Sequence, residues 1–321
     1  MSFLKNIKLQ YSTKILNQCI DSQDFTDFKE HFNNIKKLDP NIANQYLRYN
    51  ADKFIDVEDL SYLFNDNIIW ANSFNPEDAV LASNIVSQII SNTSNLSIKN
   101  FNFYQEVLSV LNDKELEDYS TVNDIFLKSH YYFQILVNNK NPNLKTLNTS
   151  SAFFEYNKNT YFTHSKLTKC FIYIIKHPYK IFDDLRHSGY ESNEIINLLC
   201  GLDDKPLQIH SEQNNKTKTC QEQRKSWSVN VSSWTNENVQ NSLRGLIINF
   251  DDLLSNLEDK LIEIAGHLKE SGIEININSQ ELNKLASTLQ INNKHLNEIE
   301  ISNKDKKIID RDCGELIAKY F

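Results

Sequence analysis

The chain has 321 residues, 40% of them hydrophobic, and a formal net charge of −8 at pH 7, which is typical of a globular protein with one large domain or two ordinary ones. The acidic balance argues against a phosphate-backbone partner, so we expect no nucleic-acid binding. No stretch approaches the roughly eighteen apolar residues of a membrane-spanning helix, and the first residues contain no apolar run of signal-peptide length. We expect a protein without a membrane span, either cytoplasmic or exported into a host cell without a cleaved signal peptide.

The positions of the glycines and cysteines exclude several classes of site. Gly189 is the first of six glycines, and the later ones match neither a P-loop nor a Rossmann spacing, so we expect no nucleotide cofactor. The five cysteines contain no C-x-x-C pair, which argues against structural zinc and favours a reducing compartment. Asp183 and His187 lie one helical turn apart, but two ligands do not make a metal site, so no metal is expected.

Residues 1 to about 140 predict one helix after another. Phe25, Phe28 and Phe32 fall on one helical face, and the run Asn75-Pro76 followed by two acids is typical of a helix start. Residues 151–163 then change character and predict a β-hairpin. A helix is expected to follow as far as Lys176, and residues 192–200 predict a short helix. We interpret residues 1–200 as a helical bundle or short solenoid.

The remainder alternates between polar and apolar segments. Residues 201–235 predict a polar loop and a strand, because Trp227, Val229 and Val231 repeat with period two. Residues 236–321 predict an α+β or helical C-terminal region. Within it, 236–270 permits two interpretations, a strand that ends near Phe250 before a helix, or one long helix with an apolar seam. The expected fold class is therefore mainly α with a minor β element, a multi-helix region followed by an α+β region.

The last twelve residues contain a cysteine that a helix start could activate. They read DRDCGELIAKYF from Asp310, with a helix expected from Asp312. A cysteine just inside a helix start lies in the positive field of the backbone N–H groups, which favours the nucleophilic thiolate. The glycine beside Cys313 leaves room for a substrate backbone.

The motif D-C-G-x-x-x-x-K-Y resembles the nucleophile motif of Ulp1-like (clan CE) cysteine proteases, a family that includes bacterial deubiquitinases. The resemblance covers roughly residues 206–321 and implies a catalytic His, Asp and Cys in that chain order. It thereby assigns Cys313 as the nucleophile and Asp251 as the acid that orients the histidine, and His210 has the matching chain order. Two positions depart from the family: Ser226 stands where the histidine is expected, and Lys307 where an oxyanion-stabilising glutamine is expected.

The resemblance implies a thiol protease that cleaves ubiquitin or ubiquitin-like conjugates. The bias towards Asn, Lys and Ile is typical of an AT-rich genome, and from this composition we expect a virulence effector of an intracellular bacterium acting in the host cell. The alternative is a non-catalytic helical protein that acts through protein–protein interaction. In both cases we expect a protein partner, no cofactor and no metal.

Overall fold

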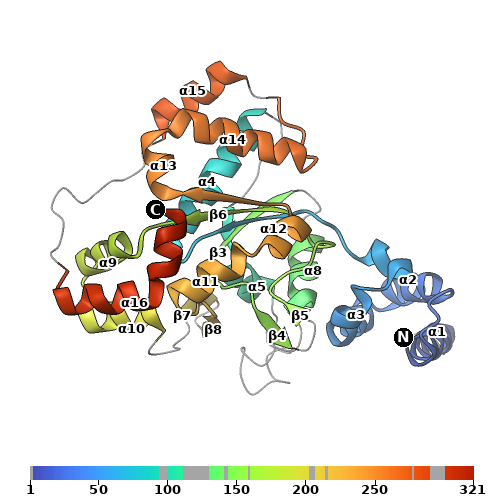
Figure 1. The fold of residues 1–321 in the computed structure, drawn as a ribbon. Helices are drawn as coiled ribbons and strands as arrows, with labels where there is room; N and C mark the ends of the chain where they lie inside the picture. The colour runs from blue at the N-terminus through green and yellow to red at the C-terminus, as the bar shows by residue number, and fades with distance from the viewer. Residues whose placement is uncertain are drawn as a thin grey trace.

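Five strands form a parallel sheet at the centre of this computed structural model, which describes residues 3–93, 100–110, 130–140, 144–157, 160–201, 207–213, 216–276, 278–289 and 301–321 (Figure 1). Every neighbouring pair of these strands runs parallel. In order across the sheet they are β2 (Asn100–Asn102), β3 (Lys145–Thr149), β1 (Ile68–Asn72), β6 (Thr168–Ile175) and β9 (Gly245–Asn249). The chain is therefore an α/β protein, and the prediction of a mainly α fold with a minor β element is wrong.

Two of the central strands lie where helices were predicted. β1 falls within the region expected to be all helical, and β6 falls on the helix expected to end at Lys176. Both strands are short apolar runs with β-branched residues and are buried on both faces, as strands in the middle of a parallel sheet must be. A strand of this kind lacks the alternation of polar and apolar residues that distinguishes a half-buried strand from a helix, which explains the error.

One face of the sheet is covered by four helices. Side chains such as Ile69 and Ile172 point to this face and pack against Ile85 and Leu261 of the covering helices. The helices are α4 (Pro76–Thr93), α13 (Phe250–Ser255), α14 (Leu257–Glu270) and α15 (Ser279–Thr288). Figure 1 shows this layer above the sheet.

The opposite face carries the larger core, in which Trp70 and Phe171 of the sheet pack among aromatic side chains such as Phe162 and Trp234. The helices of this layer are α5 (Phe103–Val110), α8 (His130–Lys140), α9 (Pro178–His187), α10 (Ser192–Cys200), α11 (Trp227–Trp234), α12 (Glu237–Leu243) and α16 (Asn303–Tyr320). Two antiparallel hairpins accompany them, β4 (Glu155–Asn157) with β5 (Thr160–Tyr161), and β7 (Leu207–Gln213) with β8 (Lys216–Glu222). The sheet is thus the middle layer of three.

The N-terminal helices form an arm beside the sheet, on the right of Figure 1. They are α1 (Phe3–Ser22), α2 (Phe28–Leu38), α3 (Pro40–Phe54) and the 3-10 turn η1 (Glu58–Leu63). Phe28 and Phe32 stack on each other in the arm, as their helical spacing predicted. No helix in the described part of the chain is both long and apolar enough to cross a membrane.

The predictions for the C-terminal half have mixed outcomes. The hairpin within 151–163 is confirmed by β4 and β5. The strand ending near Phe250 is confirmed by β9, and the single long helix over 236–270 is wrong because Arg244, at φ 53°, ends α12 in the left-handed region. The strand predicted at Trp227 is wrong, because Ser226 caps the helix α11 by accepting a hydrogen bond from the Val229 amide. β9 of the 236–321 region pairs with β6 of the 1–200 region, so the sheet joins the two.

Gly245 sits where β9 passes closest to β6. A Cβ atom at this position would overlap the ring of Phe171, its partner in the sheet register. Because that ring is fully buried and cannot move away, we expect Gly245→Ala to lower the free energy of unfolding by about 1–3 kcal/mol in urea denaturation. The control is Gly266→Ala in α14, where a Cβ meets nothing within 4 Å; it should raise stability by roughly 0.5–1 kcal/mol. Equal effects of the two substitutions would contradict the tight packing of β9 on β6.

Candidate functional site

The carboxyl ends of the parallel strands meet at one edge of the sheet. β1 leads through α4 to β2 and then to β3 on one side, whereas β6 leads through α9 towards β9 on the other. The chain that leaves β1 therefore runs to one side of the sheet, and the chain that leaves the neighbouring strand β6 runs to the other side. In open α/β sheets, ligands bind outside the strand ends at such a switch point.

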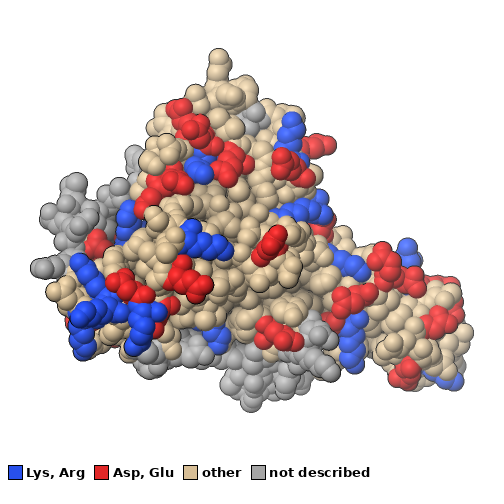
Figure 2. All heavy atoms as spheres, in the orientation of Figure 1, with Lys and Arg blue, Asp and Glu red and all other residues tan. Residues whose placement is uncertain are grey.

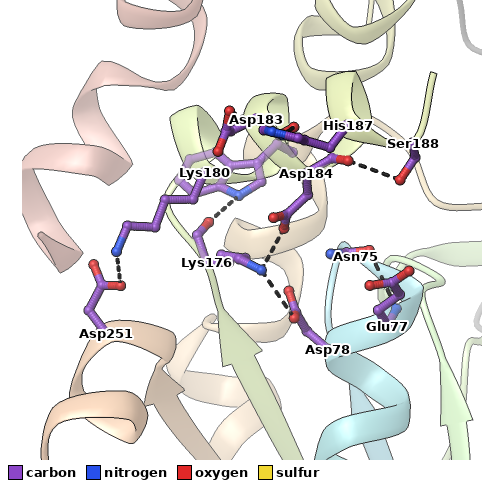
Figure 3. Close-up of polar contacts among 11 residues, drawn as sticks. Asn75, Glu77, Asp78, Lys176, Lys180, Asp183, Asp184, His187, Ser188 and Asp251 are labelled. Carbon is purple, nitrogen blue, oxygen red and sulfur yellow. Dashed lines mark hydrogen bonds and ion pairs between the residues drawn. The ribbon is translucent and has the colours of Figure 1, made fainter. Parts of the chain in front are cut away.

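A buried ion cluster occupies this switch point. Lys176 is the first residue after β6, and its Nζ lies 2.5 Å from Asp184 Oδ2 and 3.4 Å from Asp78 Oδ1. Asp78 belongs to the first turn of α4 and Asp184 to α9, so the cluster joins the segments that follow both strands (Figure 3). The Lys176 ammonium also lies 4.1 Å from the centroid of the Phe250 ring. One lysine and two aspartates leave the cluster with an excess of negative charge.

Burial changes the acid–base behaviour of Asp78. Only 4% of the residue is exposed, and burial raises the pKa of its carboxyl to about 6, although the charge of Lys176 opposes the shift. The nearby carboxylate of Asp184 raises this pKa further. A carboxyl group in such surroundings can take up and release a proton near neutral pH, a property found at functional sites.

Three buried polar atoms at the end of β1 have no hydrogen-bond partner within the described ranges: Asn72 Oδ1, Ser73 Oγ and Asp78 Oδ2. They come from two successive residues at the strand end and from the helix that follows. Buried polar atoms are normally hydrogen-bonded, so a group of orphaned atoms needs an explanation. Two of the three are pure acceptors, which suits a ligand that donates hydrogen bonds.

Side chains of α11 hydrogen-bond to the segments around the cluster. Asn230 donates hydrogen bonds to the carbonyls of Ser150 and Arg224 at 2.8 and 2.7 Å, and accepts one from the Tyr173 hydroxyl at 2.6 Å. Trp227 Nε1 donates to the Lys176 carbonyl at 3.1 Å, which fixes the backbone of the cluster lysine. These groups are buried and satisfied, so they position the edge without being available to a ligand.

Neither the helix that follows β1 nor the helix that follows β6 offers its N-terminus to an anion. α4 begins with Pro76, which lacks an N–H group, and its first turn carries the acids Glu77 and Asp78. α9 begins with Pro178, and the His177 side chain accepts a hydrogen bond from the Tyr179 amide. The chain's own side chains therefore take the place that a phosphate or sulfate would occupy at a helix N-terminus.

The residues that the sequence resemblance grouped lie on three different elements. Asp251 lies in the first turn of α13 and forms an ion pair with Lys180 of α9, beside the cluster (Figure 3). Cys313 is buried in the interior of α16, because that helix begins at Asn303 rather than near Asp312. Its thiol contacts Cys200 and Ser228, and no histidine whose side chain is described forms a hydrogen bond with it. His210 lies on β7, paired with Thr219 of β8.

The interior position reverses the electrostatics expected for Cys313. The hydrogen bond with Cys200 and burial raise the pKa of the Cys313 thiol far above its ordinary value, so the thiol stays protonated. The positive field of the first backbone N–H groups was expected to favour a thiolate at Cys313. It acts at Asn303, where α16 begins, ten positions before Cys313.

Comparisons with known proteins give one kind of match. No protein-family model and no curated protein matches the chain. Among solved structures, the chain is similar to the mouse sulfotransferase SULT7A1 in complex with PAP, with a TM-score of 0.46 and 14% identity over 84% of this chain and 96% of that one.

The interpretation as an Ulp1-like thiol protease is wrong. The chain is built on a central parallel sheet, and Cys313 lies buried in the interior of α16 rather than at a helix start. The alternative of a non-catalytic helical interaction protein is not supported either, because the molecule is built around that sheet. No finding supports the expected role as a virulence effector.

Sequence analysis missed the cluster although it singled out parts of it. The helix start at Asn75-Pro76 is confirmed, but in the sequence Asp78 indicates only a favourable charge in the first turn of a helix. The lysine was overlooked because a helix was expected to end there. A polar residue directly after a buried strand, as Lys176 is after β6, is the signal that would have found it.

Proposed function

We propose that the edge between β1 and β6 binds a small polar molecule through an amine or hydroxyl group, with Asp78 as the acceptor of its hydrogen bond and of its proton. The observation that supports this proposal most directly concerns the two oxygens of the Asp78 carboxylate. Oδ2 is buried and has no hydrogen-bond partner in the described structure, whereas Oδ1 faces Lys176. A pKa of about 6 makes this carboxylate a suitable general base near neutral pH. Ser73 Oγ and Asn72 Oδ1 supply further polar contacts.

The negative charge at this edge of the sheet favours a ligand that donates hydrogen bonds over an anionic ligand. Asp78 and Asp184 outnumber Lys176, and the helices that follow β1 and β6, α4 and α9, have occupied N-termini. A phosphate group would meet uncompensated negative charge in a site of low dielectric.

Amide NMR with three probe molecules tests the proposal. We expect ethanolamine, and more weakly glycerol, to shift the amide signals of Ser73, Asn75 and Asp78, whereas inorganic pyrophosphate leaves them unchanged. Asp78→Asn should weaken the ethanolamine response at least about tenfold, because the amide can neither carry the charge nor accept the proton. The control is Asp252→Asn, an exposed carboxylate on α13. Binding of pyrophosphate at these amides, without ethanolamine binding, would overturn the proposal.

The raised pKa of Asp78 also predicts a pH dependence of stability. A carboxyl whose pKa rises from 3.8 to about 6 on folding favours the folded state while it is protonated, and this contribution is lost as the pH rises through 6. Asp78→Asn imitates the protonated form and lacks this loss. The stability of the wild type relative to this variant should therefore fall by on the order of 2–3 kcal/mol between about pH 4 and pH 7 in urea denaturation. A constant difference over this range would show that Asp78 titrates normally.

A further inference from the structure

A cavity of about 580 Å³ lies beside the amino ends of β6 and β9. Residues 163–165 line it from the turn before β6, and residues of α12, which leads into β9, line it as well. The β4–β5 hairpin contributes Tyr161, and Phe153 comes from the segment just before that hairpin. The volume falls within the roughly 300–1,000 Å³ that is typical of small-molecule pockets. Because β6 and β9 begin here, this cavity is distinct from the ion cluster at the carboxyl edge of the sheet.

One part of the cavity wall is a fixed aromatic surface. The rings of Phe153 and Tyr161 stack in parallel, with centroids 5.7 Å apart and 7° between their planes. Phe153 also meets the buried ring of Trp234 edge-on at 5.4 Å, and the Tyr161 amide donates a hydrogen bond to the Tyr131 hydroxyl at 3.0 Å. Tyr161 is nevertheless 43% exposed. A ring that is held in place but open to solvent can receive the apolar face of a ligand with little further loss of entropy.

Most of the other lining side chains carry hydroxyl or amide groups. The side chains of Ser165 and Asn238 form no hydrogen bond with any residue that the structure describes. The Ser242 hydroxyl donates to the Val239 carbonyl at 3.2 Å, so its oxygen can still accept a hydrogen bond. Donors and acceptors are therefore both available in the cavity, which is what the hydroxyl groups of a ligand require.

The cavity carries no formal charge near neutral pH. Its lining within the described ranges contains no aspartate, glutamate, lysine or arginine. Burial lowers the pKa of His164, whose Nδ1 accepts a hydrogen bond from the Lys166 amide at 3.2 Å and whose Nε2 lies 3.4 Å from Asp56 Oδ1. Figure 2 shows that the surface between α12 and β5, located from Figure 1, is almost entirely uncharged, with acidic and basic side chains around it. These surroundings favour an uncharged ligand.

We propose that this cavity binds a neutral saccharide, with one face of a sugar ring stacked on Tyr161 and its hydroxyl groups bound by Asn238 and Ser165. A pyranose presents C–H groups on a face and hydroxyl groups around its rim. The C–H groups carry slight positive charge and suit the negative face of an aromatic ring, whereas the hydroxyls pair with groups that donate and accept. A flat aromatic ligand fits less well, because it would cover the hydroxyl and amide groups without replacing their water.

Amide NMR of the full-length protein tests the site. Lactose, maltose and cellobiose are added separately at up to about 20 mM, and we expect at least one of them to shift the amide signals of Tyr161, Ser165 and Asn238. The methyl glycoside of that sugar identifies its source. Equal affinity indicates a sugar attached to a larger molecule, and a loss of affinity indicates a free sugar. The proposal is overturned if none of the three sugars shifts these signals, or if adenosine alone does so.

Variants of the tyrosine distinguish stacking from a general effect. Tyr161→Ala should weaken binding of the sugar at least about tenfold because the aromatic face is lost, whereas Tyr161→Phe should retain most of the affinity. The matched control is Tyr190→Ala, a tyrosine of similar exposure, at 46%, just before α10. Asn238→Ala, at an exposed position of α12, should weaken binding about fivefold to tenfold. Equal binding by Tyr161→Ala and the wild type would overturn the stacking on this ring. The signals of this cavity report separately from those of the carboxyl edge, so the outcome is independent of amine binding there.

Discussion

Replacing Lys176 by methionine should lower the free energy of unfolding by about 3–5 kcal/mol. Methionine fills a similar volume but leaves Asp78 and Asp184 facing each other without the cation that separates them. Both carboxylates are largely buried, with side-chain exposures of 6% and 21%, so water cannot replace the lost partner. Urea denaturation at pH 7 measures the effect. Lowering the pH should reduce it, because protonation of the two acids removes the repulsion.

The matched control is Lys180→Met on the same side of α9. The ion pair of Lys180 with Asp251 is about half exposed, at 50% and 40%, and pairs of this kind contribute at most about 1 kcal/mol. A second test removes all charges of the cluster together. The triple variant with Lys176→Met, Asp78→Asn and Asp184→Asn should recover most of the lost stability, because no buried charge then remains unpaired. If Lys176→Met is no more harmful than Lys180→Met, the lysine is not the buried centre of the cluster.

The parts of the fold that could be predicted from sequence are those with local signals. The start of α4 at Asn75-Pro76 and the β4–β5 hairpin are set by residues within a few positions of each other, and both predictions are confirmed. β1 and β6 are different, because their apolar runs become strands only when other strands pair on both sides. That pairing joins residues more than a hundred positions apart, as Ile69 and Cys170 are, so no short window contains the information.

The candidate site was not predicted for a related reason. Lys176 and Asp78 meet only because β1 and β6 are neighbours in the sheet, so an error in the strands removes the site as well. The motif at Cys313 attracted attention because it is continuous in sequence, yet the charge and burial that decide its chemistry come from α10 and from the early start of α16. Continuity along the chain was a poor guide where the chemistry depends on neighbours in space.

Asn230→Leu should lower the free energy of unfolding by roughly 3–5 kcal/mol. Leucine has a similar shape, but it leaves three buried groups without their partner, namely the carbonyls of Ser150 and Arg224 and the hydroxyl of Tyr173. Each buried polar group left unsatisfied costs about 1–3 kcal/mol, and Asn230 itself is fully buried. The loss is therefore much larger than the replacement of an amide by an apolar side chain would cause at the surface.

Two further variants test whether the loss comes from the hydrogen bonds of Asn230 or from a general sensitivity of this helical layer to substitution. Tyr173→Phe removes one donor to Asn230 and should cost about 1 kcal/mol, since the Asn230 amide keeps its two other hydrogen bonds. Asn241→Leu on the exposed side of α12 should stay within about 0.5 kcal/mol of the wild type. Because Asn230 holds the segment after β3 against α11, its leucine variant should also broaden the amide signals of Ser150 and Ser151 more than Tyr173→Phe does. Equal stability losses for Asn230→Leu and Asn241→Leu would show that α11 does not anchor the carboxyl edge of the sheet.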